Sequence, residues 1–176
     1  GPMRFRRFGV SVSHPFEGDG GAVALRLDGA GAEGAARVFR TAGFNEEEQA
    51  GKRLYGQSTS WPRRVLNAVR FRQKNAANTA PMLWQGRLFA LLESSLPTEL
   101  DPDSLSVLGE RDLDGVIPAA FSAHPHRVPE LQSSFNFGVR YGRVTHLDLF
   151  ALPDRGSARR IGSVPLPFAP MLHDFA

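Results

Sequence analysis

The stretch Met82-Leu83-Trp84-Gln85-Gly86-Arg87-Leu88-Phe89-Ala90-Leu91-Leu92 decides the fold class of this chain. Two apolar runs, 82–84 and 88–92, flank the turn residues Gln85-Gly86-Arg87, which is the pattern of a β-hairpin. A second hairpin is expected where residues 136–140 and 144–150 flank Tyr141-Gly142-Arg143. The sequence therefore predicts an all-β fold from about residue 80 onward.

The two hairpins are related at a spacing of about 50 residues. Gly142-Arg143-Val144 follows Gly86-Arg87-Leu88 by 56 positions (142 − 86), and Gly162 follows Gly109 by 53 (162 − 109). A hairpin, a turn and a further strand that recur at this period are typical of β-propeller blades. Chance similarity between short strands and glycine turns is the alternative explanation.

The first 80 residues mix strands with short helices. Within them, strands are expected at 23–27 and 35–41, with Asp28-Gly29 as a turn. Later in the chain, a further strand is expected at 105–108. Asn45 followed by three glutamates predicts a helix start, and that helix should end near Tyr55-Gly56. Pro62 favours a second helix that runs to Val69, because proline is tolerated in the first turn.

Composition narrows the class of protein. The 176 residues are 41% hydrophobic and 22% charged, which suits one globular domain, and no apolar run is long enough for a membrane span. There is no cysteine, so disulfides and thiolate metal sites are excluded. The net charge is +3, but the 19 arginines (21 − 2 lysines) are scattered, which disfavours a nucleic-acid-binding role. Gly1-Pro2 before Met3 looks like the remnant of a cleaved tag, so the domain is expected to cover residues 3–176.

Five histidines are the natural candidates for chemistry: His14, His124, His126, His146 and His173. None belongs to a local metal-binding motif such as a histidine pair at helical spacing. By spacing alone, each histidine is best explained as solvent-facing or hydrogen-bonded.

The segments around two histidines change this interpretation. Phe121-Ser122-Ala123-His124-Pro125-His126 and Met171-Leu172-His173-Asp174-Phe175-Ala176 resemble the first two histidine motifs of the carotenoid cleavage oxygenases. Further segments resemble that family in the same order. They are His14-Pro15-Phe16-Glu17-Gly18-Asp19-Gly20, Arg37-Val38-Phe39-Arg40-Thr41, Lys74-Asn75-Ala76-Ala77-Asn78-Thr79, and the stretch from Leu92-Glu93 to Asp101-Pro102.

The resemblance implies a seven-bladed β-propeller with Fe(II) held by four histidines on its axis. His124 and His173 match two of these iron ligands, and Glu93 matches a second-shell glutamate that orients a ligand histidine. His126 is expected to be a surface or loop residue. The implied activity is that of a non-haem dioxygenase, which cleaves a C=C double bond of a carotenoid, apocarotenoid or stilbene-like substrate with O₂.

Complete members of the family are close to three times as long as this chain, so the chain is expected to be an N-terminal, truncated part. The missing ligands would come from an absent C-terminal part, from a second polypeptide, or from a second copy of the chain. A non-catalytic partial propeller that acts as a binding or interaction module is the alternative function. The predicted location is cytoplasmic, and the family's apolar substrates leave peripheral membrane contact open.

Overall fold

The computed structural model of the chain describes residues 1–175, which divide into two units. The first unit comprises Gly1–Thr79 together with Asp101–Val107, and the second comprises Ala80–Leu100 together with the residues from Leu108 onward. No helix among the described residues is both long and apolar enough to cross a membrane.

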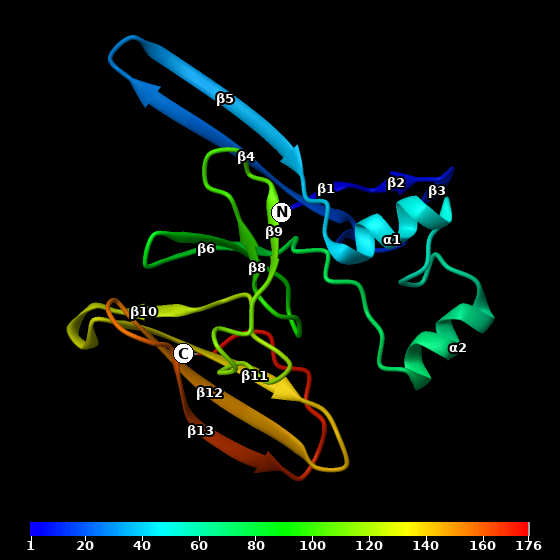
Figure 1. Cartoon of the computed structure of the whole chain (residues 1–176). Coiled ribbons are helices and arrows are strands. Elements are labelled where there is room, and N and C mark those ends of the chain that lie inside the picture. Colours follow the sequence, from blue (N-terminus) through cyan, green and yellow to red (C-terminus); the bar gives the residue numbers. More distant parts are fainter. Residues whose placement is uncertain (176) are drawn as a thin grey trace. The chain divides into compact units, whose positions relative to one another are not determined.

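The first unit combines two small sheets with two α-helices (Figure 1). Its elements are β1 (Pro2–Arg4), β2 (Arg6–Arg7), β3 (Val10–Ser11), η1 (Pro15–Glu17), β4 (Asp19–Asp28), β5 (Gly31–Val38), α1 (Ala42–Ala50) and α2 (Trp61–Val69). Strands β2 and β3 pair with each other, and the larger sheet has the order β1-β4-β5. The β4–β5 hairpin projects away from the rest of the unit. The predicted turn is confirmed, because the Asp28 carboxylate accepts hydrogen bonds from the backbone N–H groups of Ala30 and Gly31. The strands predicted at 23–27 and 35–41 exist, although residues 39–41 lie outside β5. The strand predicted at 105–108 begins two residues later, at Val107.

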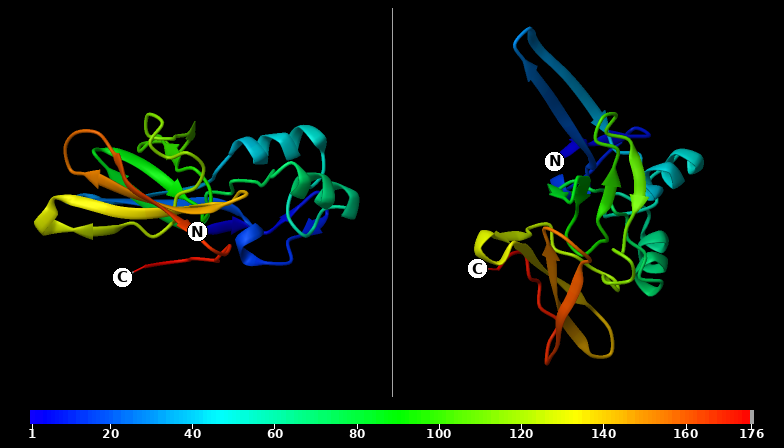
Figure 2. Two further views of the ribbon diagram at one scale, coloured as in Figure 1. Left: turned by 90° about the horizontal axis from the view of Figure 1, so that it is seen from below. Right: turned by 60° about the vertical axis from the view of Figure 1, so that its left-hand side comes forward.

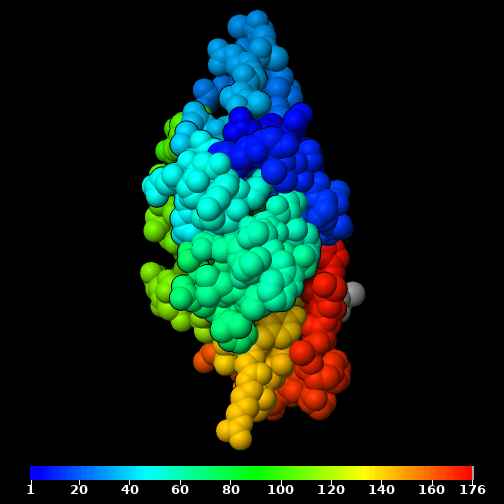
Figure 3. Space-filling view, turned by 90° about the vertical axis from the view of Figure 1, so that its right-hand side faces the viewer, coloured from blue at the N-terminus to red at the C-terminus, as the bar shows by residue number. Residues whose placement is uncertain are grey.

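Helix α1 begins and ends earlier than predicted. Its N-cap is Thr41, whose hydroxyl accepts a hydrogen bond from the Phe44 N–H, so Asn45 lies inside the helix instead of starting it. Gly51, in the left-handed conformation at φ 62°, ends α1 well before the predicted end near Gly56. Helix α2 confirms the prediction based on Pro62. Figure 3 views the face of the unit that these two helices cover.

The second unit is built from two four-stranded antiparallel sheets (Figure 2). The first contains β6 (Ala80–Trp84), β7 (Arg87–Leu91), β8 (Thr98–Leu100) and β9 (Val107–Glu110). The second contains β10 (His126–Val128), β11 (Ser133–Arg140), β12 (Thr145–Pro153) and β13 (Arg159–Leu166), and the short helix η2 (Pro129–Leu131) connects its first two strands. In both sheets the strands are neighbours in chain order, which is the arrangement of a propeller blade.

Both predicted hairpins are confirmed. In the β6–β7 hairpin, Gln85 and Gly86 have φ values of 49° and 76°, as a tight two-residue turn requires. The predicted repeat, however, aligned the two hairpins with each other incorrectly. Gly86 lies in the first turn of its sheet, whereas Gly142 lies in the second turn of the other sheet. Gly109 and Gly162 both fall in the fourth strands, so only this pair marks equivalent places in the two blades.

The core of the second unit is aromatic and aliphatic. Phe89, Phe121 and Phe150 are fully buried, and Ile117 and Leu152 pack in the same cluster. Each such side chain contributes about 1.5–3 kcal/mol through burial. Phe121 and the fully buried Ala123 belong to this cluster, so the backbone just before His124 is anchored in the core.

An ion-pair cluster joins β7, β8 and the residue directly after β9 in the first sheet. Glu99 of β8 accepts hydrogen bonds from Arg87 at 2.8 and 3.1 Å and from Arg111 at 2.5 Å. The hydrogen bonds from Arg87 dominate over the opposing effect of burial and lower the pKa of Glu99 from 4.5 to about 2. The carboxylate is therefore a more stable anion in the folded chain than in the unfolded chain.

We expect Glu99→Gln to lower the free energy of unfolding by about 1 kcal/mol at pH 6, since both arginines are about 40% exposed and solvent screens the pair. Because folding lowers the pKa, this stabilisation is complete above pH 4.5 and is lost as the pH falls toward 2. Urea unfolding at pH 6 and pH 3 checks this. A difference between wild type and variant that does not shrink at pH 3 would contradict it.

Gly1 and Pro2, which the sequence predicts to lie outside the domain, are ordered against β4. The Gly1 amino group donates a hydrogen bond to the Gly21 carbonyl at 3.1 Å, and Pro2 pairs with Gly20 in the β1–β4 register.

Candidate metal centre

Three segments of the second unit bring the candidate ligands together. Glu93 follows β7, His124 precedes β10, and His173 lies in the extended segment after β13. An isolated β-bridge between Ser95 and Phe121 fixes the first two segments side by side. Figure 2 shows the last segment, in red, running back along the β10–β13 sheet.

The three side chains form a compact cluster. One ligand atom from each of Glu93, His124 and His173 lies within 4.8 Å of the others. Glu93 Oε1 is 3.5 Å from His124 Nε2 and 3.4 Å from His173 Nδ1. The two imidazole rings meet edge to face, with their centroids 4.5 Å apart. The family resemblance predicted that these three residues share one site, and the structure places their side chains together.

The donor atoms suit a metal ion. His124 Nε2 is buried and has no hydrogen-bond partner among residues 1–175, so this nitrogen is available to coordinate a metal ion. His173 turns Nδ1 toward Glu93, so its other ring nitrogen, Nε2, is the one that could coordinate a metal ion. Imidazole nitrogen is a good ligand for Fe(II), and a carboxylate beside an imidazole N–H orients the ring. Metal binding at these residues stays a prediction.

Ser122 connects the backbones of the two histidine segments, a role that the sequence motif did not reveal. Its hydroxyl accepts a hydrogen bond from the His124 N–H at 3.2 Å and donates one to the His173 carbonyl at 3.3 Å. Its own carbonyl accepts from Asn136 Nδ2 at 2.7 Å. Because Ser122 is buried, these bonds are partly shielded from water and connect the backbones of the two histidine segments.

Glu93 has an environment that favours a cationic neighbour. Burial raises its pKa, while a hydrogen bond from the Ala123 N–H at 3.2 Å and the nearby imidazoles oppose that effect. A half-buried carboxylate of this kind is most stable when a positive charge lies close to it.

The other three histidines lie outside the cluster. His126 is half-exposed at the start of β10, and its Nε2 lies 2.8 Å from Asp174 Oδ1, a hydrogen bond that lowers the pKa of Asp174. The Asp174 carboxylate therefore pairs with the imidazole of His126 and not with that of the adjacent His173. His14 caps η1 by accepting from the Phe16 N–H, and His146 lies in β12 with Nδ1 beside the Val144 carbonyl.

Comparison with known proteins places this geometry in context. The family model described as retinal pigment epithelial membrane protein (RPE65) matches residues 1–176. The chain is 31% identical to the apocarotenoid-15,15'-oxygenase of Synechocystis over 94% of its length, which is 36% of that protein. It is 32% identical to resveratrol cleavage oxygenase 1 of Aspergillus fumigatus over 92% of its length, which is 32% of that protein.

Solved structures agree with the sequence matches. The structure of cobalt-substituted Synechocystis apocarotenoid oxygenase matches the whole chain with a TM-score of 0.87 at 30% identity, and the match covers 39% of that structure. A chimera of that oxygenase with RPE65 gives a TM-score of 0.86 at 29% identity with the same coverage. The chain therefore spans roughly a third of the length of the curated relatives it matches.

Proposed function

Because the chain belongs to the RPE65 and carotenoid cleavage oxygenase family, we propose that it is the N-terminal part of an Fe(II)-dependent dioxygenase. The proposed reaction is cleavage of a C=C double bond in a carotenoid, apocarotenoid or stilbene-like substrate by O₂. The observation that carries this proposal is the cluster of His124, His173 and Glu93. Relatives are named as oxygenases of apocarotenoids and resveratrol, and one solved relative contains cobalt in place of its metal.

Each residue of the cluster has a distinct proposed role. His124 would bind the metal through Nε2, the nitrogen that has no hydrogen-bond partner among the described residues. His173 would bind through Nε2 while Glu93, whose Oε1 lies 3.4 Å from Nδ1, orients the ring and raises its basicity. Bound Fe(II) would supply the activation of O₂.

Two imidazoles do not complete an iron site. Open sites of iron oxygenases usually hold at least three protein ligands. We propose that the remaining ligands come from a completing C-terminal part or from a second chain. By itself this chain is expected to bind Fe(II) without cleaving a polyene or a stilbene.

An anaerobic Fe(II) titration, repeated with Co(II) as a spectroscopic substitute, tests the proposal. We expect one metal ion per chain or per two chains. His124→Ala and His173→Ala should each weaken binding at least ~100-fold, because each removes a direct ligand. Glu93→Gln should weaken it by about 10–100-fold, since it removes the negative charge beside the imidazoles but no direct ligand.

His146→Ala is the matched control, because His146 lies in the same unit but outside the cluster. Metal binding that survives both ligand substitutions would refute the assignment. A folded chain without specific metal binding would favour the alternative function, a non-catalytic partial propeller that acts as an interaction module.

A cytoplasmic location with peripheral membrane contact is the accompanying proposal. Helix α2 supports such contact, because it leaves Trp61 and Val69 more than 70% exposed beside Arg70. Val69→Asp should therefore reduce co-sedimentation with anionic liposomes several-fold, and equal sedimentation of both proteins would argue against membrane contact.

A further inference from the structure

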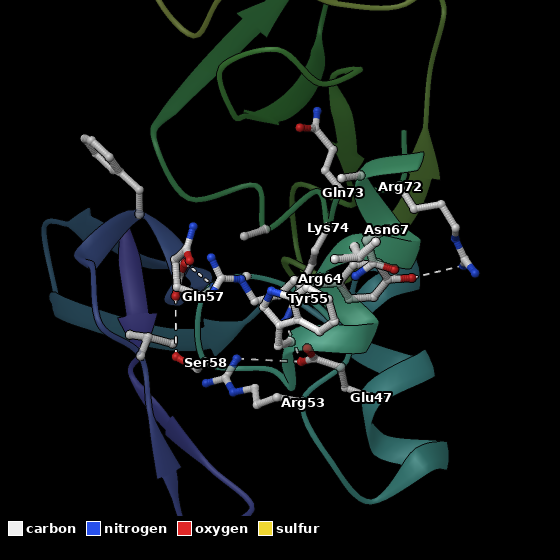
Figure 4. Close-up of a pocket in the computed structure, with 18 residues that line it drawn as sticks. Glu47, Arg53, Tyr55, Gln57, Ser58, Arg64, Asn67, Arg72, Gln73 and Lys74 are labelled. Atoms are coloured by element: carbon white, nitrogen blue, oxygen red, sulfur yellow. Dashed lines mark hydrogen bonds and ion pairs between the residues drawn. The ribbon is translucent and has the colours of Figure 1, made fainter. Parts of the chain in front are cut away.

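A cavity of about 520 Å³ lies in the first unit, far along the sequence from the histidine cluster (Figure 4). Residues from η1, from the segment between the helices and from α2 line it. Its size is in the range that holds small-molecule ligands. The proposed oxygenase chemistry makes no use of this cavity.

Arg53 is the unusual residue of the cavity lining. It is 7% exposed, and its Nε and Nη2 have no hydrogen-bond partner among residues 1–175. Its Nη1 lies 3.6 Å from Glu47 Oε2, which is too long for a hydrogen bond. A buried guanidinium with unused donors is costly, and a small rotation of the side chain toward the cavity would let an anion there satisfy them.

The neighbouring charges limit the kind of anion. Glu17 and Glu47 also line the cavity, and both are already engaged. Glu17 accepts from the Gln57 N–H at 2.7 Å, and Glu47 from Arg7 and Lys74 at 2.9 Å each. Two fixed carboxylates repel a dianion such as phosphate more strongly than a monoanion. A carboxylate also matches the planar fork of a single guanidinium.

The other lining residues favour a ligand whose carboxylate is attached to an apolar group. Phe16, Trp61 and Val65 line the cavity and are 59%, 71% and 43% exposed, so they leave apolar area for a ligand to cover. Arg64 of α2 is an exposed residue in the same lining and adds a second cation. Figure 4 shows Arg72 directed toward Tyr55, whose hydroxyl it contacts at 3.0 Å, so that arginine is already used.

We propose that this cavity binds a small organic carboxylate with an aromatic or otherwise apolar body, with Arg53 as the principal anchor. The ligand buries its apolar part against Trp61 and Val65 and directs its carboxylate toward Arg53. This site is independent of the proposed metal centre.

Ligand-observed NMR titrations with benzoate, its neutral analogue benzamide and inorganic phosphate test the proposal. Benzoate should bind saturably and at least ~10-fold more tightly than either of the other two, and Arg53→Met should remove that preference. Arg70→Met is the control, because Arg70 follows α2 without lining the cavity. Benzamide binding as tightly as benzoate, or phosphate binding as tightly, would overturn the assignment.

A second pair of variants keeps the test decisive if Arg53→Met fails to fold. Ala68 is an exposed residue of α2 that lines the cavity, so it tolerates substitution. Ala68→Glu should weaken benzoate binding at least ~10-fold relative to Ala68→Gln. The two new side chains are nearly the same size, but only glutamate adds a negative charge that repels the carboxylate. Equal affinities in this pair would refute the proposal. His124→Ala should leave benzoate binding unchanged, which separates this test from that of the metal centre.

Discussion

Glu47→Gln is expected to lower the free energy of unfolding by about 3–5 kcal/mol, the largest effect that we expect from a single charge. The carboxylate of Glu47 is fully buried. Its Oε2 accepts hydrogen bonds from Arg7 and Lys74, both at 2.9 Å, and its Oε1 accepts one from the Leu54 N–H at 3.1 Å. Glutamine keeps the shape but removes the charge, which leaves buried cations without compensation.

Asp19 cannot replace the lost charge, because it is already shared. It is bonded to Lys74 and lies 3.4 Å from Arg7. Arg7 also packs over the Phe44 ring at 3.8 Å, so a displaced guanidinium would disturb the core side of α1. The effect should therefore spread from the ion pair to the packing of the helix.

Glu48→Gln is the matched control for this substitution. Glu48 is the next residue and contacts the same arginine at 2.6 Å, but its side chain is 41% exposed. Its loss should cost much less stability than the loss of Glu47, because solvent screens an exposed ion pair. Urea unfolding of the two variants under the same conditions decides the matter, and similar losses would show that burial does not govern this cluster.

Gly138→Ala is expected to destabilise the second unit by about 3 kcal/mol or more and to disrupt the histidine cluster. A Cβ at this position would lie 1.9 Å from the Ala120 carbonyl oxygen and 2.6 Å from its carbon. Both atoms belong to backbone, so a side chain cannot move aside to relieve the clash. The segment that carries Ser122 and His124 would have to shift from β11, to which the Ser122 N–H is bonded at 2.7 Å.

Gly162→Ala is the control within the same sheet. A Cβ there would meet only the Leu149 side chain, at 3.6 Å, which is an ordinary contact. This control should change stability by less than about 1 kcal/mol. Thermal unfolding and Co(II) affinity of both variants test the prediction, which fails if the two alanines behave alike.

Local sequence patterns predicted the elements whose geometry is decided locally. The β6–β7 hairpin follows from two turn residues that tolerate positive φ, so it could be recognised without any tertiary information. The start of α1 could not, because Thr41 and Asn45 are both good capping residues. The buried side chain of Phe44 is part of the helix that Thr41 begins, and tertiary packing of this kind is not visible in a local pattern.

The candidate sites depended on long-range structure. Glu93, His124 and His173 are 31 and 49 positions apart (124 − 93 and 173 − 124), and no spacing rule brings them together. Only the family resemblance connected them. In the sequence, Glu47 is one of three glutamates at a predicted helix start, and Arg53 is one of many scattered arginines. Their burial arises from packing between segments, which composition does not encode.

The Ser122 hydroxyl connects two segments that lie at either end of the β10–β13 sheet in the sequence, and this connects metal binding to the stability of that sheet. His124 precedes β10 and His173 follows β13, so the imidazoles can meet only when the strands between them are folded. A metal ion held by both rings would bind the folded blade and not the open chain. Its binding free energy would then add to the stability of that blade, by RT ln(1 + [metal]/Kd). In such linkage, melting of the sheet and release of the metal become a single cooperative event.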